Sequence, residues 1–276
     1  MKLILLTVLT MCAFAANSLL TRAAVEGGHI GPGAFALLRV AAGAGMLGGI
    51  AVWRGHSLPL LRRVRLVGAV SLTAYIVGFS LAYLTLDAGL GALILFGVTQ
   101  ITMFGHAAVT GQRPTPRQLI GASAAFSGLV LVLWPTAQSI ADPLGAVLMC
   151  LAGVGWAAYT IAGRGAADPL ATTGANFIIC LPLLAVLLLK SDLDSDATGV
   201  ALAVICGAVT SGLGYALWYS VLTQMRGTTA AVIQLSVPVI AILAGAVLLD
   251  EMVTPVVMIA AALVVGGIGW SVTAKR

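Results

Sequence analysis

The chain consists of long apolar runs separated by short polar breaks. Each run is long enough to form a membrane-spanning helix, which needs about 20 largely apolar residues to cross roughly 30 Å of hydrocarbon. Several breaks contain residues that end helices, such as Asp142-Pro143 and Asp168-Pro169. The pattern predicts ten spans, near residues 3–22, 32–52, 66–86, 89–109, 118–136, 143–162, 170–189, 198–222, 229–249 and 255–273.

The composition agrees with this pattern and excludes a water-soluble fold. Of the 276 residues, 60% are hydrophobic and only 8% are charged, whereas soluble domains carry about 25% charged residues. Ten spans leave no room for a separate catalytic domain, so we do not expect an enzyme. The predicted fold class is an all-α integral membrane protein with ten transmembrane helices.

The four cysteines lie within apolar runs, so we interpret them as buried small residues and expect no disulfide, metal site or cofactor. The first run follows Lys2 and contains small residues, which is also typical of a cleaved signal peptide. Because this run has a counterpart later in the chain, we expect it to be retained as the first helix.

The basic residues predict the orientation of the chain in the membrane. With the N-terminus in the cytoplasm, the inner segments hold 11 Lys and Arg residues and the outer loops hold 2, with Arg39 left inside a span. Lys and Arg are retained in the cytoplasm, so both termini are predicted to be cytoplasmic, in a bacterial inner membrane. The same scatter argues against a nucleic-acid partner despite the net charge of +5.

An internal repeat divides the chain into residues 1–137 and 138–276. Three pairs of segments match in the same order, namely residues 14–22 with 156–164, 78–83 with 214–219, and 92–116 with 231–255. Chance similarity among Ala, Gly and Leu is the alternative, but the matches include Arg, Pro and aromatic positions. Five spans are an odd number, so the two units must be inverted, a construction typical of secondary transporters with a central site between the repeats.

The two units resemble EamA domains of the drug/metabolite transporter superfamily. The resemblance covers nearly the whole chain and depends on the order of several short motifs. These are Gly91-Ala92 and Thr229-Ala230-Ala231, the polar or proline positions Thr99 and Pro238, the turn Leu249-Asp250-Glu251, and the glycines of the last span of each unit. The position of Arg39 in the second predicted span also resembles the pattern of that family.

Within the superfamily, the chain resembles the YddG-type amino-acid exporters. This resemblance implies a ten-helix bundle with a central cavity and export of aromatic and other amino acids with broad specificity. The first unit departs from the pattern, with Gly111-Gln112 where an acidic turn is common. We therefore interpret Asp250-Glu251 as a solvated loop.

Aromatic and uncharged polar side chains within the spans are the first candidates for substrate contact. Tyr75, Phe79 and Tyr83 lie at helical spacing on one face, and Tyr215, Trp218 and Tyr219 form the related stripe of the second unit. Packing between helices is the alternative for each of them. The remaining candidates are amide and aromatic side chains within spans, and each either binds substrate or ties helices together. They are Asn17, Gln100, Trp156, Tyr159 and Gln234.

Two further positions have open interpretations. Arg39 is the one charge well inside a predicted span, so it is either a partner for a substrate carboxylate or a side chain that reaches to the membrane surface. Pro238 interrupts a span, as a hinge that frees a carbonyl or as a simple kink.

These features predict a secondary transporter that works by alternating access as a monomer in the lipid bilayer. No Asp or Glu lies deep in any predicted span, so we expect no proton-coupling carboxylate of the kind that antiporters titrate. Small molecules, and amino acids first, are the expected substrates. A carrier of another small metabolite or drug is the alternative.

Overall fold

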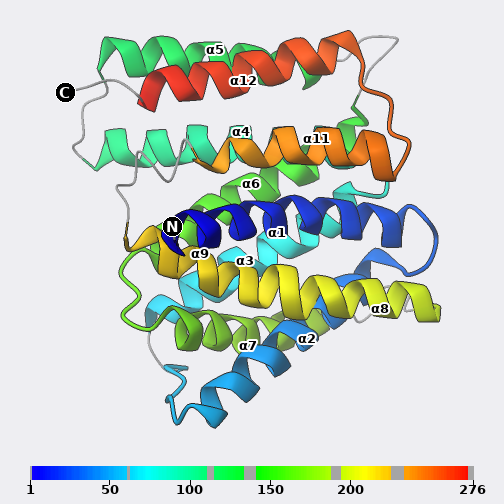
Figure 1. Cartoon of the computed structure of the whole chain (residues 1–276), viewed down its shortest axis with the longest axis vertical. Helices are drawn as coiled ribbons and strands as arrows, with labels where there is room; N and C mark the ends of the chain where they lie inside the picture. Colours follow the sequence, from blue (N-terminus) through cyan, green and yellow to red (C-terminus); the bar gives the residue numbers. More distant parts are fainter. Residues whose placement is uncertain are drawn as a thin grey trace.

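The computed structural model describes residues 2–60, 63–110, 115–133, 141–187, 194–224 and 233–272. These residues form helices connected by short loops (Figure 1). The helices are α1 (Lys2–Val25), α2 (Pro32–Trp53), α3 (Arg63–Ala82), α4 (Ala88–Val109), α5 (Pro116–Leu133), α6 (Pro143–Gly163), α7 (Pro169–Leu187), α8 (Ala197–Ile205), the π-helix η1 (Cys206–Leu213), α9 (Gly214–Leu222), α11 (Ser236–Leu248) and α12 (Pro255–Val272).

The helices begin where the sequence supplies proline and a side-chain cap. Proline is the first residue of α2, α5, α6, α7 and α12, a position where its missing N–H costs nothing. Asp142, Asp168 and Asp196 stand just before α6, α7 and α8, and each accepts a hydrogen bond from a backbone N–H three residues later, at 2.7, 3.0 and 2.8 Å. Nine of the ten predicted spans therefore begin within a few residues of an observed helix start, and the start predicted near residue 229 lies outside the described residues.

Seven helical stretches of the described chain are long and apolar enough to cross a membrane. They are α1 to α4, α6, α7 and the continuous rod formed by α8, η1 and α9, residues Ala197–Leu222. The apolar helices α11 and α12 are shorter in their described parts, so ten spans remain a prediction. The boundary between the two units, the Gly111-Gln112 turn and Thr229-Ala230-Ala231 lie outside the described residues.

The helices are arranged in pairs across the bundle. At one edge α5 lies along α12, next to them α4 lies along α11, and at the opposite edge α2 packs against α7 (Figure 1). Between these edges α3 packs on α6, and α1 contacts α11, η1 and α9. The start of α1 and the end of α12 lie at the same end of the bundle (Figure 1).

The predicted span 198–222 contains a π-helical segment that the sequence pattern did not indicate. The wide turn of η1 lies against α2, and a side chain at Gly207 would collide with the backbone carbonyl of Arg39. This close approach turns Thr210 and Ser211 toward α1 and α2. A π-helical turn within an α-helix is frequently found at functional sites.

Candidate functional site

The predicted aromatic stripes meet in the middle of the bundle. We call the group formed by the following side chains the aromatic cluster: Phe14, Tyr75, Phe79, Tyr83, Trp156, Tyr159, Tyr215, Trp218 and Tyr219. Each is at most 3% exposed. The ring centroids of Trp156 lie 4.8 Å from Tyr215, 5.1 Å from Tyr75 and 5.4 Å from Phe14. The two stripes, far apart in sequence, thus share one continuous aromatic surface.

Arg39 points into this cluster. Its side chain is fully buried on α2, so it does not reach to the membrane surface. Its Nε donates to Ser211 Oγ at 2.8 Å, and its Nη2 donates to the hydroxyls of Tyr215 and Tyr75 at 2.8 and 3.2 Å. The guanidinium carbon lies 5.0 Å from the centre of the Phe79 ring, within cation–π range.

The charge of Arg39 has no counter-ion in the described part of the chain. All of its hydrogen-bond acceptors there are neutral hydroxyls, and its Nη1 has no hydrogen-bond partner. A buried arginine is normally paired with a carboxylate, because an isolated charge in a low dielectric is costly. The arrangement therefore leaves one nitrogen of the guanidinium, Nη1, without an acceptor in the described chain.

Other buried polar atoms near the cluster are also without partners. Tyr159 Oη and Trp218 Nε1 make no hydrogen bond within the described residues, although each side chain is fully buried. The same holds for Asn176 Oδ1 on α7, which lies beside Gly68. Buried polar groups are usually satisfied, so these atoms offer donors and acceptors to a polar ligand or to water.

The predicted amide residues have different surroundings. The Oδ1 of Asn17 accepts from Thr210 at 2.7 Å and from Ser211 at 3.0 Å, which ties α1 to η1. Gln234 Oε1 accepts from the indole N–H of Trp156 at 3.4 Å, so it contacts the aromatic cluster. Gln100 is buried on α4 with its Nε2 unpartnered, and no hydrogen bond joins it to the cluster within the described residues.

Pro238 lies in the first turn of α11. The helical pattern of residues 233–248 is interrupted at Leu235, three residues before Pro238. A proline has no N–H to donate to the carbonyl four residues earlier, here that of Gln234. The interruption thus stands next to a residue that touches the cluster, as a kink or hinge would require.

At one end of the bundle, which we call the Arg22 end, ion pairs join three elements. Arg22 at the end of α1 lies 3.4 Å from Asp87, 4.0 Å from Glu251 and 3.8 Å from Glu26. Glu251 accepts hydrogen bonds from the backbone N–H of Ala88 at 2.5 Å and of Gly89 at 3.3 Å, at the start of α4. These contacts hold α1, α4 and the loop after α11 together.

The expectation of a solvated Asp250-Glu251 loop is correct for exposed Asp250 and wrong for Glu251. The Glu251 side chain is only 9% exposed, because it turns inward onto the α4 N-terminus, where backbone N–H groups attract a carboxylate. Burial raises the pKa of this carboxyl above its ordinary value. The backbone of Asp250 has a φ of 53°, which produces the turn.

The Arg22 end also has a pocket of about 470 Å³ beside the loop between α1 and α2. His29 Nδ1 lies 2.8 Å from Asp196 Oδ2 there. The hydrogen bonds from His29 and from the Gly199 N–H lower the pKa of Asp196. This exposed pair joins the start of α8 to the loop after α1.

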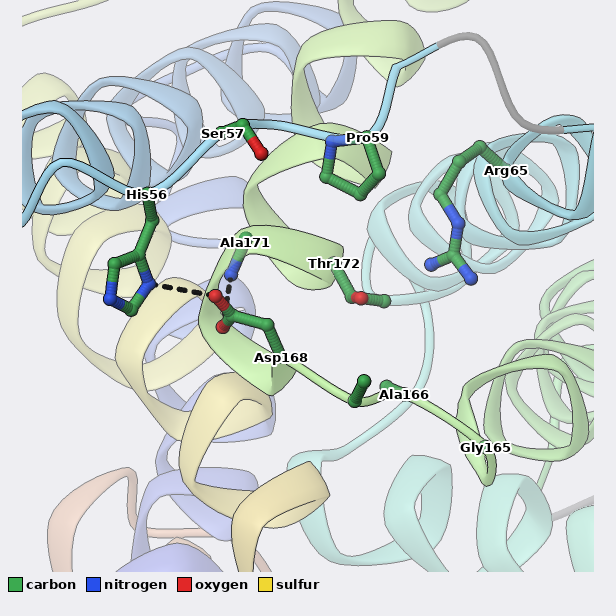
Figure 2. A pocket seen from close by; sticks show the side chains of 10 residues that line it. His56, Ser57, Pro59, Arg65, Gly165, Ala166, Asp168, Ala171 and Thr172 are labelled. Atoms are coloured by element: carbon green, nitrogen blue, oxygen red, sulfur yellow. Dashed lines mark hydrogen bonds and ion pairs between the residues drawn. The ribbon is translucent and has the colours of Figure 1, made fainter.

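The opposite end, which we call the Arg65 end, has a pocket of about 400 Å³ (Figure 2). It lies between the loop that follows α2, with His56, and the loop before α7, with Asp168. His56 Nδ1 is 2.7 Å from Asp168 Oδ2. Arg65 from α3 also lines the pocket, opposite His56 (Figure 2).

The sequence reasoning missed several of these residues. Phe14 lay in the matched repeat segment but was not among the candidates, although an aromatic residue at its partner position, Trp156, was. Ser211 is a hydroxyl within a span and carried the same polar signal as Asn17. Arg22 and Arg65 were interpreted only as orientation signals, because no sequence pattern shows which arginines turn inward.

Comparisons with known proteins agree with this architecture. A family model described as the EamA-like transporter family matches residues 143–273. An uncharacterized protein of Pseudomonas aeruginosa is 44% identical over 271 residues, covering 97% of this chain and 93% of its own. An uncharacterized transporter of Archaeoglobus fulgidus is 27% identical over 222 residues, covering 78% of this chain and 79% of its own.

A solved structure, titled only as the crystal structure of a protein, has the same fold. It superposes with a TM-score of 0.70 at 20% identity and covers 96% of both chains. At this identity the likeness concerns the fold alone. The arrangement of helices around the cluster is therefore shared with a known structure over nearly the whole length.

Proposed function

The chain belongs to the EamA-like transporter family, and from this premise we propose that it transports amino acids, aromatic ones among them, with broad specificity. It is a multi-pass membrane protein with a transporter's role, and the relative from Archaeoglobus fulgidus is named a transporter. The substrate, the direction and the mechanism given below are the proposal.

The observation that carries the proposal is Arg39 within the aromatic cluster. An uncompensated guanidinium is well suited to hold a carboxylate, and the N–H groups of Arg39 Nη1 have no partner in the described chain. The surrounding rings offer apolar contact to a side chain and a π face to an ammonium group. An α-carboxylate at Arg39 with an aromatic side chain against Trp156 and Phe79 uses both properties.

We propose that the site opens alternately to each side by relative movement of two inverted five-helix units, residues 1–137 and 138–276. The pairing of helices supports this, because α2 with α7, α4 with α11, and α5 with α12 are pairs of helices at equivalent places in the two units. A two-fold axis between inverted repeats brings equivalent helices together in this way. The aromatic cluster draws residues from both units.

The proposed direction is export from the cytoplasm through the bacterial inner membrane, with both termini cytoplasmic. The excess of basic residues on one side supports this orientation. The start of α1 and the end of α12 lie at the same end of the bundle, which is consistent with both termini facing the cytoplasm (Figure 1). The Arg65 end then faces the cytoplasm and the Arg22 end faces outward.

We propose no cofactor and a monomeric carrier whose transport follows the substrate gradient. The described helices that cross the bundle contain no Asp or Glu that could carry a coupled proton. Strict stoichiometric proton flux in proteoliposomes would contradict this part of the proposal.

The test is counterflow of radiolabelled amino acids into liposomes that contain the purified chain and an excess of unlabelled amino acid. We expect uptake of phenylalanine and of several other amino acids, and no uptake in protein-free liposomes. Absence of uptake for every amino acid of a broad panel, with a correctly folded protein, would remove amino acids as substrates.

The second candidate is a carrier of another small metabolite or drug. The large aromatic surface favours it, because apart from Arg39 few charged groups impose selectivity there. Competition in the counterflow assay separates the two, since a drug carrier is inhibited by aromatic cations and an amino-acid carrier is not.

A further inference from the structure

The pocket at the Arg65 end contains a positive charge that the described contacts leave uncompensated. Arg65 is only 7% exposed, yet its Nε has no hydrogen-bond partner and no ion pair reaches it within the described residues. An arginine that serves only orientation at a helix end extends its long side chain into water or lipid headgroups. Arg65 instead lies along the wall of the pocket (Figure 2).

The carboxylate of this pocket does not balance Arg65. Asp168 lies across the pocket, where one oxygen contacts His56 at 2.7 Å and the other accepts from the Ala171 N–H at 3.0 Å (Figure 2). Both oxygens are thus engaged at the start of α7, where the helix dipole also offsets the negative charge. The Arg65 side of the pocket keeps its positive charge.

The position of Arg65 on α3 connects the pocket with the aromatic cluster. Arg65, Gly68, Leu72 and Tyr75 follow at spacings of three, four and three residues, so they share one face of the helix. Tyr75 contacts Arg39 at the other end of this stretch, about 15 Å further along α3 at 1.5 Å per residue. Beside the stretch lies Asn176, whose buried Oδ1 has no partner.

We propose that Arg65 forms a carboxylate-binding site in this pocket, distinct from the site at Arg39. The guanidinium would bind the carboxylate through two N–H donors, and the hydroxyl of Thr172, which lies nearer to Arg65 in the same pocket (Figure 2), would complete the contacts. A role for this site in the entry of substrate rests on the proposed function. The binding of an anion at the site is tested independently of transport.

The experiment measures how fast a cysteine in the pocket reacts with thiol reagents of opposite charge. Ala166 lines the pocket, so Ala166→Cys is made in the full chain together with Cys12→Ala, which removes the exposed native cysteine. The purified protein is reacted with anionic sulfonatoethyl and cationic trimethylammonioethyl methanethiosulfonate. We expect the ratio of the anionic to the cationic labelling rate to fall about 5-fold when Arg65→Gln is added, because the positive charge is then gone.

Two matched variants separate charge from structure. Arg65→Lys keeps the positive charge and should keep the rate ratio, whereas Lys2→Gln removes an exposed positive charge at the start of α1, at the same end of the bundle, and should leave the ratio unchanged. With Arg65 intact, benzoate should slow the labelling and benzylammonium should not. This arm remains decisive if Arg65→Gln fails to fold.

An unchanged rate ratio in Arg65→Gln, or equal effects of benzoate and benzylammonium, overturns the site. In that case a successful amino-acid counterflow still upholds the proposed function. If instead the labelling depends on Arg65 and no amino acid is transported, the anion site stands and the proposed substrate fails.

Discussion

Arg22 and Arg164 stand at matching positions of the sequence repeat, yet their surroundings at the two ends of the bundle differ. Arg22 lies within 4.0 Å of three carboxylates and donates to the carbonyl of Tyr83 at 3.2 Å. Arg164 follows α6 at the Arg65 end, where it is exposed and has no ion pair among the described residues. Arg65 nearby is buried and equally without an ion pair there.

This difference shows that two arginines at matching positions of the predicted repeat can have opposite surroundings. At the Arg22 end, positive charge is neutralised by acidic residues from α4 and from the loop after α11, and the helices are held together. From Arg39 to the Arg65 end, positive charge is left uncompensated in the described chain. The helices are therefore held together by ion pairs at the Arg22 end, and the proposed anion sites lie between the centre and the Arg65 end.

The largest expected effect comes from removing the central charge. Arg39→Gln should lower counterflow by at least roughly 30-fold, because losing one partner of a buried, hydrogen-bonded charge pair costs about 2 to 5 kcal/mol. The variant should fold, since replacing an uncompensated buried charge by a neutral group is not destabilising in itself. Counterflow and thermal unfolding of the same preparation check both statements.

Arg164→Gln is the matched control, because it removes an arginine that has no described partner. It should transport at the parent rate. Loss of transport in both variants would show that net charge, and not the position of Arg39, governs activity.

The second prediction concerns the contacts that hold the helices together at the Arg22 end. Glu251→Ala removes the acceptor for the Ala88 and Gly89 N–H groups, and hydrogen bonds to a charged group are worth about 1.5 to 3 kcal/mol. We expect these amides to exchange with deuterium about 10-fold faster, measured by mass spectrometry of the peptide that contains them.

Two variants sharpen this result. Glu251→Gln keeps one acceptor and should restore much of the protection, while Asp250→Asn removes a neighbouring, exposed charge and should change nothing. Unaltered exchange in Glu251→Ala would mean that Glu251 does not hold the start of α4 in place.

A smaller effect is expected when the two matching arginines are compared directly. Arg22→Gln should lower the apparent melting temperature by about 2 to 4 °C, which corresponds to about 1 kcal/mol for a chain of this size. Arg164→Gln should leave it unchanged. Equal shifts for the two variants would contradict the asymmetry between the ends.

The smallest expected effect is a pH dependence of closure at the Arg22 end. Burial raises the pKa of Glu251, so the closed arrangement binds a proton more tightly than an opened, solvated one. Between the ordinary and the raised pKa, closure is therefore favoured as the pH falls and disfavoured as it rises. Exchange at the Ala88 and Gly89 amides, corrected for the intrinsic effect of pH, should slow by about 2-fold as the pH falls through this window. The dependence should vanish in Glu251→Gln.

The positions of the helices could be predicted well from the sequence. Prolines and capping aspartates mark their starts, and the apolar runs have the length of a span, so nine of the ten predicted starts agree with the structure within a few residues. The aromatic stripes could also be predicted to face inward, because Tyr75, Phe79 and Tyr83 recur at helical spacing. The structure then brings them together with the stripe of the second unit.

The polar contacts could not be predicted in the same way. The π-helical turn at residues 206–213 depends on the close approach of Gly207 to α2, a contact between segments far apart in sequence. The burial of Glu251 depends on its position against the start of α4, which a loop sequence does not reveal. Likewise, only the packing of α2 shows that Arg39 turns inward and does not extend to the surface.

The central claim is that Arg39 holds the carboxylate of the substrate. Competition in phenylalanine counterflow tests it most directly, with unlabelled phenylalanine compared with phenylalaninamide, which has the same side chain and ammonium group but no carboxylate. We predict that phenylalaninamide competes at least roughly 30-fold more weakly with the parent chain. In any residual transport by Arg39→Gln, this difference should disappear. Equal competition by the two compounds with the parent chain would contradict the account.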